Sequence, residues 1–241
     1  MTARERADRL LVARGLFDSR AKAQAAIAAG LVTADDRPVR KPSDELALDS
    51  RIEAAAAFPW VSRGGVKLAH ALDVLAIDPA GRICLDVGAS TGGFTEVLLA
   101  RGARRVFAVD VGRDQLHARL RARPEVVSLE ATDIRTLDRA RIDAAPDLVV
   151  IDVSFISLKL VLPAALAAPR AELVALIKPQ FEAPRRQRKK GVVRDGAVHA
   201  AVCADIADFV ASLGWTVLAT LPSPIEGGEG NREFFIGARR G

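Results

Sequence analysis

The stretch of residues 82–101 limits the fold of this chain more than any other. It opens with an apolar run, Arg82 to Val87, which is typical of a buried strand and stops at glycines and small hydroxyl residues. A helical pattern, Gly93 to Arg101, follows, and the unpaired N–H groups of its first turn would face whatever lies against the glycines. The sequence therefore predicts a strand, a tight ligand-binding turn and a helix. An ordinary glycine-rich turn between strand and helix is the alternative.

The residues of the turn limit which ligands it can bind. No Gly-Lys-Ser/Thr follows, so it is not a phosphate-binding Walker loop, and its glycines lack the Gly-x-Gly-x-x-Gly spacing of dinucleotide sites. The chain also lacks a separate catalytic domain for a hydride-accepting substrate, which argues against a dehydrogenase. S-adenosylmethionine has no phosphate and needs room for a methionine tail. A turn of small residues without a lysine therefore suits that cofactor better.

Strand and helix patterns alternate through the rest of the chain. Such alternation is typical of an α/β fold in which helices cover both faces of a mostly parallel sheet, here of seven strands. The further predicted strands are 105–110, 126–129, 147–153, 173–178, 216–221 and 233–236. One further predicted helix begins at about Lys67 and carries Leu68, Leu72 and Leu75 on one side, and the others cover 113–121, 160–168 and 198–213.

Ligands of such sheets bind at the carboxyl ends of the strands. That rule brings Gly88, Asp110, Asp133, Asp152 and Lys178 together, because each ends or directly follows a predicted strand. An acid in the position of Asp110 is placed to accept hydrogen bonds from ribose hydroxyls, and Asp133 could do the same for an adenine amino group. The sequence therefore predicts a cofactor site at this edge.

Four charged residues are candidates for catalysis: Lys67, Asp152, Lys178 and Glu233. Two lysines and two carboxylates sum to zero charge, so they can share a partly buried site that none could occupy cheaply alone. A ribose 2′-hydroxyl is a very weak acid, so its attack on a methyl group needs an oriented oxygen and a group that takes the proton. We expect Lys178 to orient and deprotonate that hydroxyl, with Asp152 and Glu233 holding the lysine in place. Each residue alone is more often a surface charge.

Residues 1–57 form a smaller predicted domain, followed by a linker at 58–61 and the larger domain at 62–241. Helices are expected at 4–15 and 19–29, and strands at 31–33 and 46–53. Acids nearly balance the bases of this segment, so a solvated surface is an alternative to RNA binding. The basic candidates there are Arg4, Arg6, Arg9, Arg14, Arg20 and Lys22.

A second group of bases directly follows the region of Lys178 and contains no acid. Runs of this kind are usually solvated loops, but next to a catalytic lysine we favour a clamp on the RNA backbone whose binding weakens steeply with salt. Its members are Arg185, Arg186, Arg188, Lys189, Lys190 and Arg194, and Arg63 near the linker is a further candidate.

The composition of the chain favours some of the remaining classes of function and excludes others. The formal charge of +5 and a pI near 9.7 suit a polyanionic partner. Cys84 and Cys203 lack Cys-x-x-Cys spacing and the three histidines are scattered, so we expect no metal site. The first residues do not have the apolar core of a signal peptide, and no apolar run is long enough to cross a bilayer. A cytoplasmic monomer without stable membrane association is expected.

The first quarter of the chain resembles the S4-type RNA-binding domain. The resemblance rests on Arg-Leu-Leu-Val-x-x-Gly-Leu, Asp-Ser-Arg-x-x-Ala, Ile-x-x-Gly-Leu-Val-Thr and Arg-Pro-Val-x-Lys-Pro-Ser, in that order. In that family, basic residues around the second helix contact the RNA backbone, and such contacts position a substrate without reading its sequence.

Six further motifs, taken together, resemble the TlyA family, whose catalytic half is similar to FtsJ-type RNA 2′-O-methyltransferases. They begin at Ser62, Asp86, Ile151, Ile177, Gly191 and Gly230 and read SRGGVKL, DVGASTGGFT, IDVSFIS, IKPQFE, GVVRD and GNREFF. The resemblance implies Lys-Asp-Lys-Glu catalysis by Lys67, Asp152, Lys178 and Glu233. It implies that S-adenosylmethionine is held by Asp86, Gly88, Ala89, Ser90, Thr91, Gly92, Gly93, Phe94, Thr95, Asp110 and Asp133.

The resemblance also implies ribosomal RNA as the substrate, either as free RNA or in a ribosomal subunit. The target would be a cytidine 2′-hydroxyl of the large subunit, with a second one in the small subunit for some members. Two other functions stay open at this point. One is a membrane-active protein, since family members are often named haemolysins, and the other is a non-catalytic RNA-binding or ribosome assembly factor.

Overall fold

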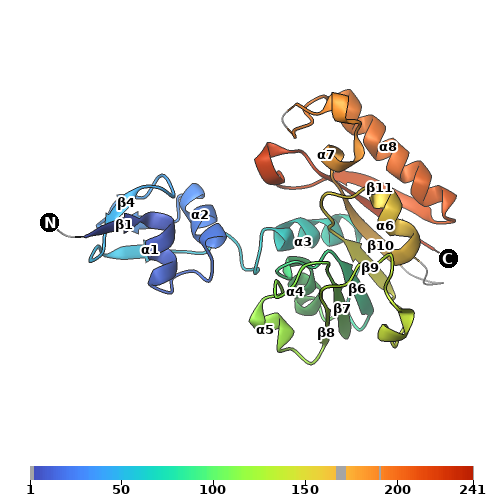
Figure 1. Ribbon diagram of the computed structural model, residues 1–241, viewed down its shortest axis with the longest axis horizontal. Helices are drawn as coiled ribbons and strands as arrows, with labels where there is room; N and C mark the ends of the chain where they lie inside the picture. The colour runs from blue at the N-terminus through green and yellow to red at the C-terminus, as the bar shows by residue number, and fades with distance from the viewer. Residues whose placement is uncertain (1–2, 167–171, 190, 241) are drawn as a thin grey trace. The chain divides into compact units, whose positions relative to one another are not determined.

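A computed structural model describes residues 3–166, 172–189 and 191–240 of the chain (Figure 1). The chain divides into two compact units, Met1–Pro59 and Trp60–Gly241. None of the helices in these described ranges is long and apolar enough to cross a bilayer.

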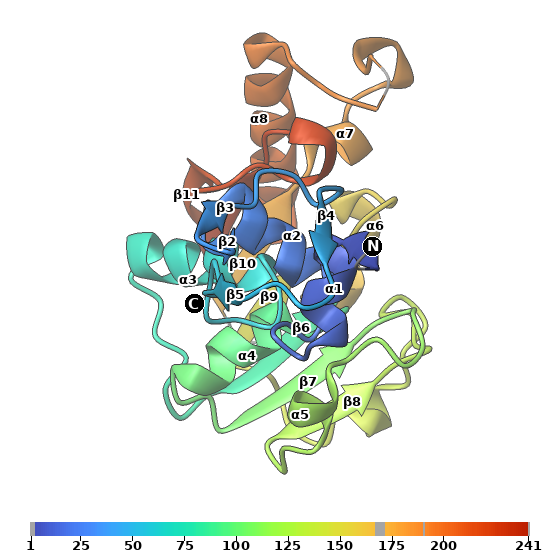
Figure 2. The ribbon, with the colours of Figure 1, turned by 90° about the vertical axis from the view of Figure 1, so that its left-hand side faces the viewer.

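The N-terminal unit packs two helices against two small sheets. Its core contains Leu11, Ile27 and Val32, each nearly or fully buried, and Ser19 caps the second helix by accepting a hydrogen bond from the N–H of Lys22. Strands β2, β3 and β5 form one sheet, visible in Figure 2, and β1 pairs with β4. The elements are β1 (Arg4–Arg6), α1 (Ala7–Ala13), α2 (Arg20–Ala28), β2 (Val32–Ala34), β3 (Arg37–Pro38), β4 (Glu45–Ala47) and β5 (Ile52–Ala54).

Two expectations for this unit are wrong. Arg4–Arg6 does not begin the first helix, because it pairs antiparallel with Glu45–Ala47 and so gives its backbone groups to a sheet. The strand expected at 46–53 is two strands, β4 and β5. The turn between them is fixed by Arg14, whose guanidinium donates to the carbonyl oxygens of Leu48 and Ser50. Both contacts join residues that are far apart in the sequence, so the local spacing of apolar residues could not predict them.

The C-terminal unit is built on a seven-stranded sheet with the order β11-β12-β10-β9-β6-β7-β8. Strand β12 runs antiparallel to both neighbours and the remaining pairs are parallel. The mostly parallel α/β fold is thereby confirmed. The strands are β6 (Ile83–Val87), β7 (Arg105–Val109), β8 (Val126–Leu129), β9 (Leu148–Ile151), β10 (Glu172–Ile177), β11 (Thr216–Pro222) and β12 (Phe234–Arg239).

Helices cover both faces of this sheet, because successive strand residues point to opposite sides. Cys84 and Val150 belong to the core beneath α3 and α4, whereas their neighbours Leu85 and Val149 belong to the core beneath α6 and α8. The helices are α3 (Gly64–Leu75), α4 (Gly93–Ala100), α5 (Ala118–Arg121), α6 (Leu158–Ala165), α7 (Pro179–Glu182) and α8 (Gly196–Ser212).

The helix expected at 113–121 is only one turn long. Its first half is a loop in which the N–H groups of Gln115 and Leu116 donate to the Glu130 carboxylate and Asp114 has a positive φ of 51°. A distant acid therefore takes the backbone donors that a helix would have used. The last residues of the helix expected at 160–168 lie outside the described residues, and α6 itself begins earlier, at Leu158.

Candidate active site

The turn after β6 approaches the end of β9 closely, and glycine permits this. Gly88 has a φ of +85°, and a Cβ on it would lie 2.3 Å from the backbone oxygen of Asp152. Gly92 has a φ of +94°, and a Cβ there would lie 2.4 Å from a methyl carbon of Leu120. Both glycines are therefore needed for the backbone path and for the space around it.

A pocket of about 830 Å³ lies beside this turn, at the carboxyl edge of the sheet. Four residues predicted to bind the cofactor line it: Gly88, Ser90, Asp110 and Asp133. Asp152 also lines it, as do the apolar residues Val111 and Phe155. Phe155 was not predicted from the sequence; its side chain is 90% exposed at a positive φ of 65°, and its ring lies 5.0 Å from that of Phe181.

The other seven predicted cofactor residues do not line the pocket. Phe94 is buried against Phe235, Ala89 packs near Leu116, and Thr95 binds Asp86 within the core. These three side chains therefore pack into the protein next to the turn. The seven are Asp86, Ala89, Thr91, Gly92, Gly93, Phe94 and Thr95.

Two of the three acids that line the pocket, Asp110 and Asp133, are held differently. Asp110 accepts hydrogen bonds from the N–H groups of Ser90, at 2.8 Å, and Gly112, at 2.7 Å, so its carboxylate is fixed by backbone. Asp133 accepts from the guanidinium of Arg135 at 2.6 to 3.0 Å, which lowers the pKa of Asp133. Arg135 therefore shares the lone pairs that the sequence assigned to an adenine amino group.

Asp86 is a fully buried acid under the turn. Its Oδ2 accepts from the Thr95 hydroxyl at 2.7 Å, while its Oδ1 has no hydrogen-bond partner among the described residues. Burial raises the pKa of Asp86 to about 7, and the hydrogen bond from Thr95 opposes that shift.

The four predicted catalytic residues form two ion pairs. Lys67 Nζ lies 2.5 Å from Glu233 Oε2, and both side chains are at most 10% exposed. Lys178 Nζ lies 2.6 Å from Asp152 Oδ1, a contact whose angles fall outside hydrogen-bond geometry. Lys178 also donates to the Ser154 hydroxyl at 2.8 Å. Among the described residues, Glu233 therefore contacts Lys67 and not Lys178, which is held by Asp152 and Ser154.

Sheet register explains why residues so distant in sequence meet. Ile177 of β10 pairs with Phe234 of β12, so Lys178 and Glu233 are the next residues on two neighbouring antiparallel strands. Strand β9, which leads to Asp152, lies on the other side of β10. Lys67 comes from α3, whose Leu68 and Leu72 share a core with Leu176 of β10 and Phe235 of β12.

The basic candidates of the N-terminal unit all have partners within that unit. Arg6 and Arg20 pair with the buried carboxylate of Asp8 at 3.1 and 2.7 Å and hold the pKa of Asp8 well below its usual range. Arg6 and Arg20 nevertheless keep side-chain exposures of 39% and 50%. The remaining contacts are Arg9 with Glu5, Lys22 with Asp18, Arg4 with the Glu45 carbonyl and Arg14 with the carbonyls of Leu48 and Ser50.

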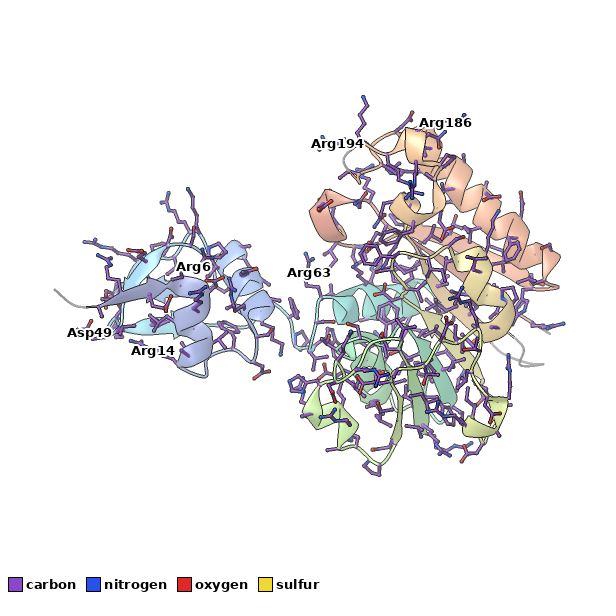
Figure 3. The ribbon with its side chains drawn as sticks, viewed as in Figure 1. Arg6, Arg14, Asp49, Arg63, Arg186 and Arg194 are labelled. Carbon is purple, nitrogen blue, oxygen red and sulfur yellow. The ribbon has the colours of Figure 1, made fainter. Side chains whose placement is uncertain are left out.

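The basic candidates of the C-terminal unit are less constrained. Arg63, Arg185, Arg186, Lys189 and Arg194 are exposed, and Figure 3 shows Arg186 and Arg194 projecting near one end of this unit. Arg188 is different, because its guanidinium folds back and donates to the carbonyl oxygen of Ala183. Lys190 lies outside the described residues.

In the described ranges, no three His, Cys, Asp or Glu side chains are arranged to hold a metal ion.

Known families match both units. Residues 60–240 match the FtsJ-like methyltransferases, and residues 5–52 match the S4 domain. The likeness of the fold extends to methyltransferases of low identity, such as the magnesium protoporphyrin IX methyltransferase of Synechocystis PCC 6803 with bound S-adenosylhomocysteine (TM-score 0.51, 15% identity, 74% of this chain and 82% of that chain).

Individual proteins match over nearly the whole chain. The Mycobacterium tuberculosis protein named 16S/23S rRNA (cytidine-2′-O)-methyltransferase TlyA is 47% identical over 99% of this chain and 91% of its own length. Hemolysin A of Brachyspira hyodysenteriae is 36% identical over 95% of this chain and 97% of its own length. A solved Streptococcus thermophilus structure that carries a hemolysin name is 38% identical, with a TM-score of 0.79 over 100% of this chain and 90% of that chain. The chain therefore belongs to the TlyA family of FtsJ-like methyltransferases and carries an S4 domain at its N-terminal end.

Proposed function

We propose that this methyltransferase transfers a methyl group from S-adenosylmethionine to the 2′-hydroxyl of a cytidine in ribosomal RNA. The observation that carries the proposal is the pair of lysine–carboxylate contacts, Lys67 with Glu233 and Lys178 with Asp152, beside an acid-lined pocket. A relative that is 47% identical and named for this reaction on 16S and 23S rRNA supports the same substrate.

The pocket suits S-adenosylmethionine by its chemistry. Asp110, Asp133 and Asp152 give it an acidic lining, which fits a cofactor that carries a sulfonium and an ammonium group and no phosphate. Asp110, fixed by two backbone donors, would accept hydrogen bonds from the ribose hydroxyls. Gly88 and Ser90 would hold the methionine part at the turn. When bound, this cofactor supplies an electrophilic methyl group.

Lys178 would orient the ribose 2′-hydroxyl and, as the neutral amine left after its ammonium group has released a proton to solvent, take the proton of that hydroxyl. Asp152 and Ser154 fix the position of its amino group, so little reorganisation is needed when the hydroxyl arrives. Lys67 and Glu233 form the second ion pair at this edge of the sheet, and their opposite charges add no net charge to the site. Their arrangement requires no covalent intermediate on the protein, and the residues act chiefly by positioning the oxygen for in-line attack.

RNA binding would come from both units. The exposed residues Arg185, Arg186, Lys189 and Arg194 would contact backbone phosphates near the site, together with Arg63. In the N-terminal unit, Arg6 and Arg20 remain 39% and 50% exposed while they pair with the buried Asp8 carboxylate, so their guanidiniums would still be accessible to phosphates. Such contacts would position the RNA without reading its sequence.

The first test is to incubate the protein with radiolabelled S-adenosylmethionine and separated ribosomal subunits. Label at a ribose is then mapped by primer extension at low nucleotide concentration, which stalls at 2′-O-methyl groups. A stop at a cytidine of either subunit supports the proposal and identifies the subunit. A protein that binds the cofactor but labels neither subunit would contradict it.

A further inference from the structure

The Glu233 carboxylate is enclosed on three sides. Lys67 Nζ lies 2.5 Å from its Oε2, and the amide nitrogen of Gln180 lies 3.4 Å from its Oε1. The third side is the backbone of Gly227, where an added Cβ would lie 2.0 Å from Oε1 and 3.0 Å from Oε2. The Glu233 residue is only 4% exposed, and an added Cβ at position 227 would push its carboxylate away from the contacts with Lys67 and Gln180.

Gly227 is not required by its backbone conformation. Its φ of −74° and ψ of −164° lie in a region that other residues adopt without strain. The loop cannot retreat freely either, because the Gly227 N–H donates to the Asn231 carbonyl at 2.8 Å and the Ser223 N–H donates to the Glu233 carbonyl at 2.9 Å. The reason for a glycine at this position is therefore the space that the Glu233 carboxylate occupies.

Gln180 reaches the same carboxylate from α7, two residues after Lys178. A carboxylate can only accept, so the amide nitrogen of Gln180 must face Glu233. The amide oxygen is then turned away, and it is buried without a hydrogen-bond partner among the described residues. A buried carbonyl without a partner costs stability, so this side chain is poorly explained as a structural one.

We propose that Gly227 and Gln180 are positioning residues that hold the Glu233 carboxylate against Lys67. Gly227 acts by leaving the carboxylate its space, and Gln180 acts by donating to the oxygen that Lys67 does not contact. The inference rests on the proposed function, in which Glu233 belongs to the catalytic edge.

The test compares Gly227→Ala with Gly228→Ala in the full chain. Gly228 is the adjacent residue, is exposed, has no positive φ, and a Cβ on it would meet nothing within 4 Å. With ribosomal subunits and labelled S-adenosylmethionine, Gly227→Ala is expected to lower kcat at least tenfold. The KM for subunits and the Kd for the cofactor should stay within about twofold, and Gly228→Ala should match the unchanged protein in all three.

Gln180→Leu is the second variant and removes both the donor and the unpartnered oxygen. It is expected to lower kcat several-fold with a thermal midpoint equal to or above that of the unchanged protein, a combination that a structural glutamine would not give. If Gly227→Ala fails to fold, this variant decides the inference.

Glu233→Gln separates the inference from the proposed function. If Glu233→Gln keeps full activity, the proposed role of Glu233 is wrong. If Glu233→Gln loses activity while Gly227→Ala equals Gly228→Ala, or while Gln180→Leu keeps its kcat, the proposed role of Glu233 stands and the positioning inference is overturned.

Discussion

Lys178 is the side chain whose loss should separate chemistry from binding most clearly. It contacts Asp152 and Ser154 at the sheet edge and does not line the cofactor pocket. We expect Lys178→Ala to lower methyl transfer by about 10²- to 10⁴-fold, the usual contribution of a general base. Cofactor affinity measured by calorimetry and RNA affinity measured by filter binding should change little.

Lys159→Ala is the matched control for this variant. Lys159 pairs with Asp205 at 2.5 Å on the surface of α6, so its removal takes away one lysine and one ion pair outside the site. Activity of Lys178→Ala equal to that of Lys159→Ala would remove the proposed base.

Asp86 should make the stability of the protein depend on pH. Its pKa of about 7 in the folded chain lies above the ordinary value of 3.8, so the folded state holds a proton that the unfolded state has lost between these values. Stability is therefore present at low pH and falls as the pH rises through about 7. Asp86→Asn keeps an acceptor for the Thr95 hydroxyl and cannot ionise. At pH 8 we expect it to raise the free energy of unfolding by about 1 to 3 kcal/mol.

Urea unfolding of both proteins from pH 5 to 8.5 measures this effect. The gain from Asp86→Asn should shrink as the pH falls toward 5. A difference that stays constant over this range would mean that Asp86 does not titrate there.

Residues at strand ends were the most predictable part of the site. Asp110, Asp133 and Asp152 follow parallel strands, and this alone places them at one edge. Ser154, Gln180 and Gly227 were not predicted, because their roles depend on which side chain arrives from another element. The role of Gly227 follows only from the position of a carboxylate six residues later.

At the scale of elements, the predicted helix boundaries were wrong where residues distant in sequence accept or pair with the backbone N–H groups that a helix would have used. Strand β1 pairs with β4 about forty residues later, and Glu130 takes the N–H groups that would have begun a longer helix before α5. The long buried strands β6, β7 and β10 were predicted to within about one residue of their ends. These strands are buried on both faces of the sheet and therefore consist largely of continuous apolar runs. Such runs can be recognised from the local sequence.

The basic segment between α7 and α8 should account for much of the salt dependence of RNA binding. Replacing Arg185, Arg186 and Lys189 with serine removes three exposed cations, and each lost phosphate contact should lower the slope of log K against log salt by about 0.7 to 0.9. Arg188 is left in place because it holds the Ala183 carbonyl. Filter binding to ribosomal subunits over a range of salt concentrations gives the slope.

Arg104, Arg239 and Arg240 provide a control with the same change in charge. Arg104 precedes β7, Arg239 ends β12 and Arg240 follows it. Because β12 runs antiparallel, all three lie at the amino edge of the parallel strands, opposite the site. Replacing them with serine should leave the slope nearly unchanged. Equal slopes for the two triple variants would mean that the basic segment is a solvated loop.

For the whole molecule, charge is distributed unevenly. With 35 basic and 30 acidic residues in the chain, removing the six bases of residues 185–194 would leave one more acid than base. Residues 1–59 contain ten basic and nine acidic residues, so the N-terminal unit is nearly neutral. The positive balance of the chain therefore comes from one segment of the C-terminal unit.

This distribution predicts the behaviour of a chain shortened to residues 60–241. The C-terminal unit contains the pocket, both ion pairs and its own core, so the shortened chain should fold and bind S-adenosylmethionine with unchanged affinity. Its affinity for ribosomal subunits at a fixed salt concentration should fall by at least tenfold, because the RNA contacts that we propose for the S4 domain are lost. Most of its salt slope should remain, since the basic segment is still present.

Calorimetry with the cofactor and filter binding at several salt concentrations measure both quantities. A shortened chain that binds subunits as tightly as the full chain would remove the S4 domain from RNA recognition, whereas loss of most of the slope would transfer the electrostatic role to it.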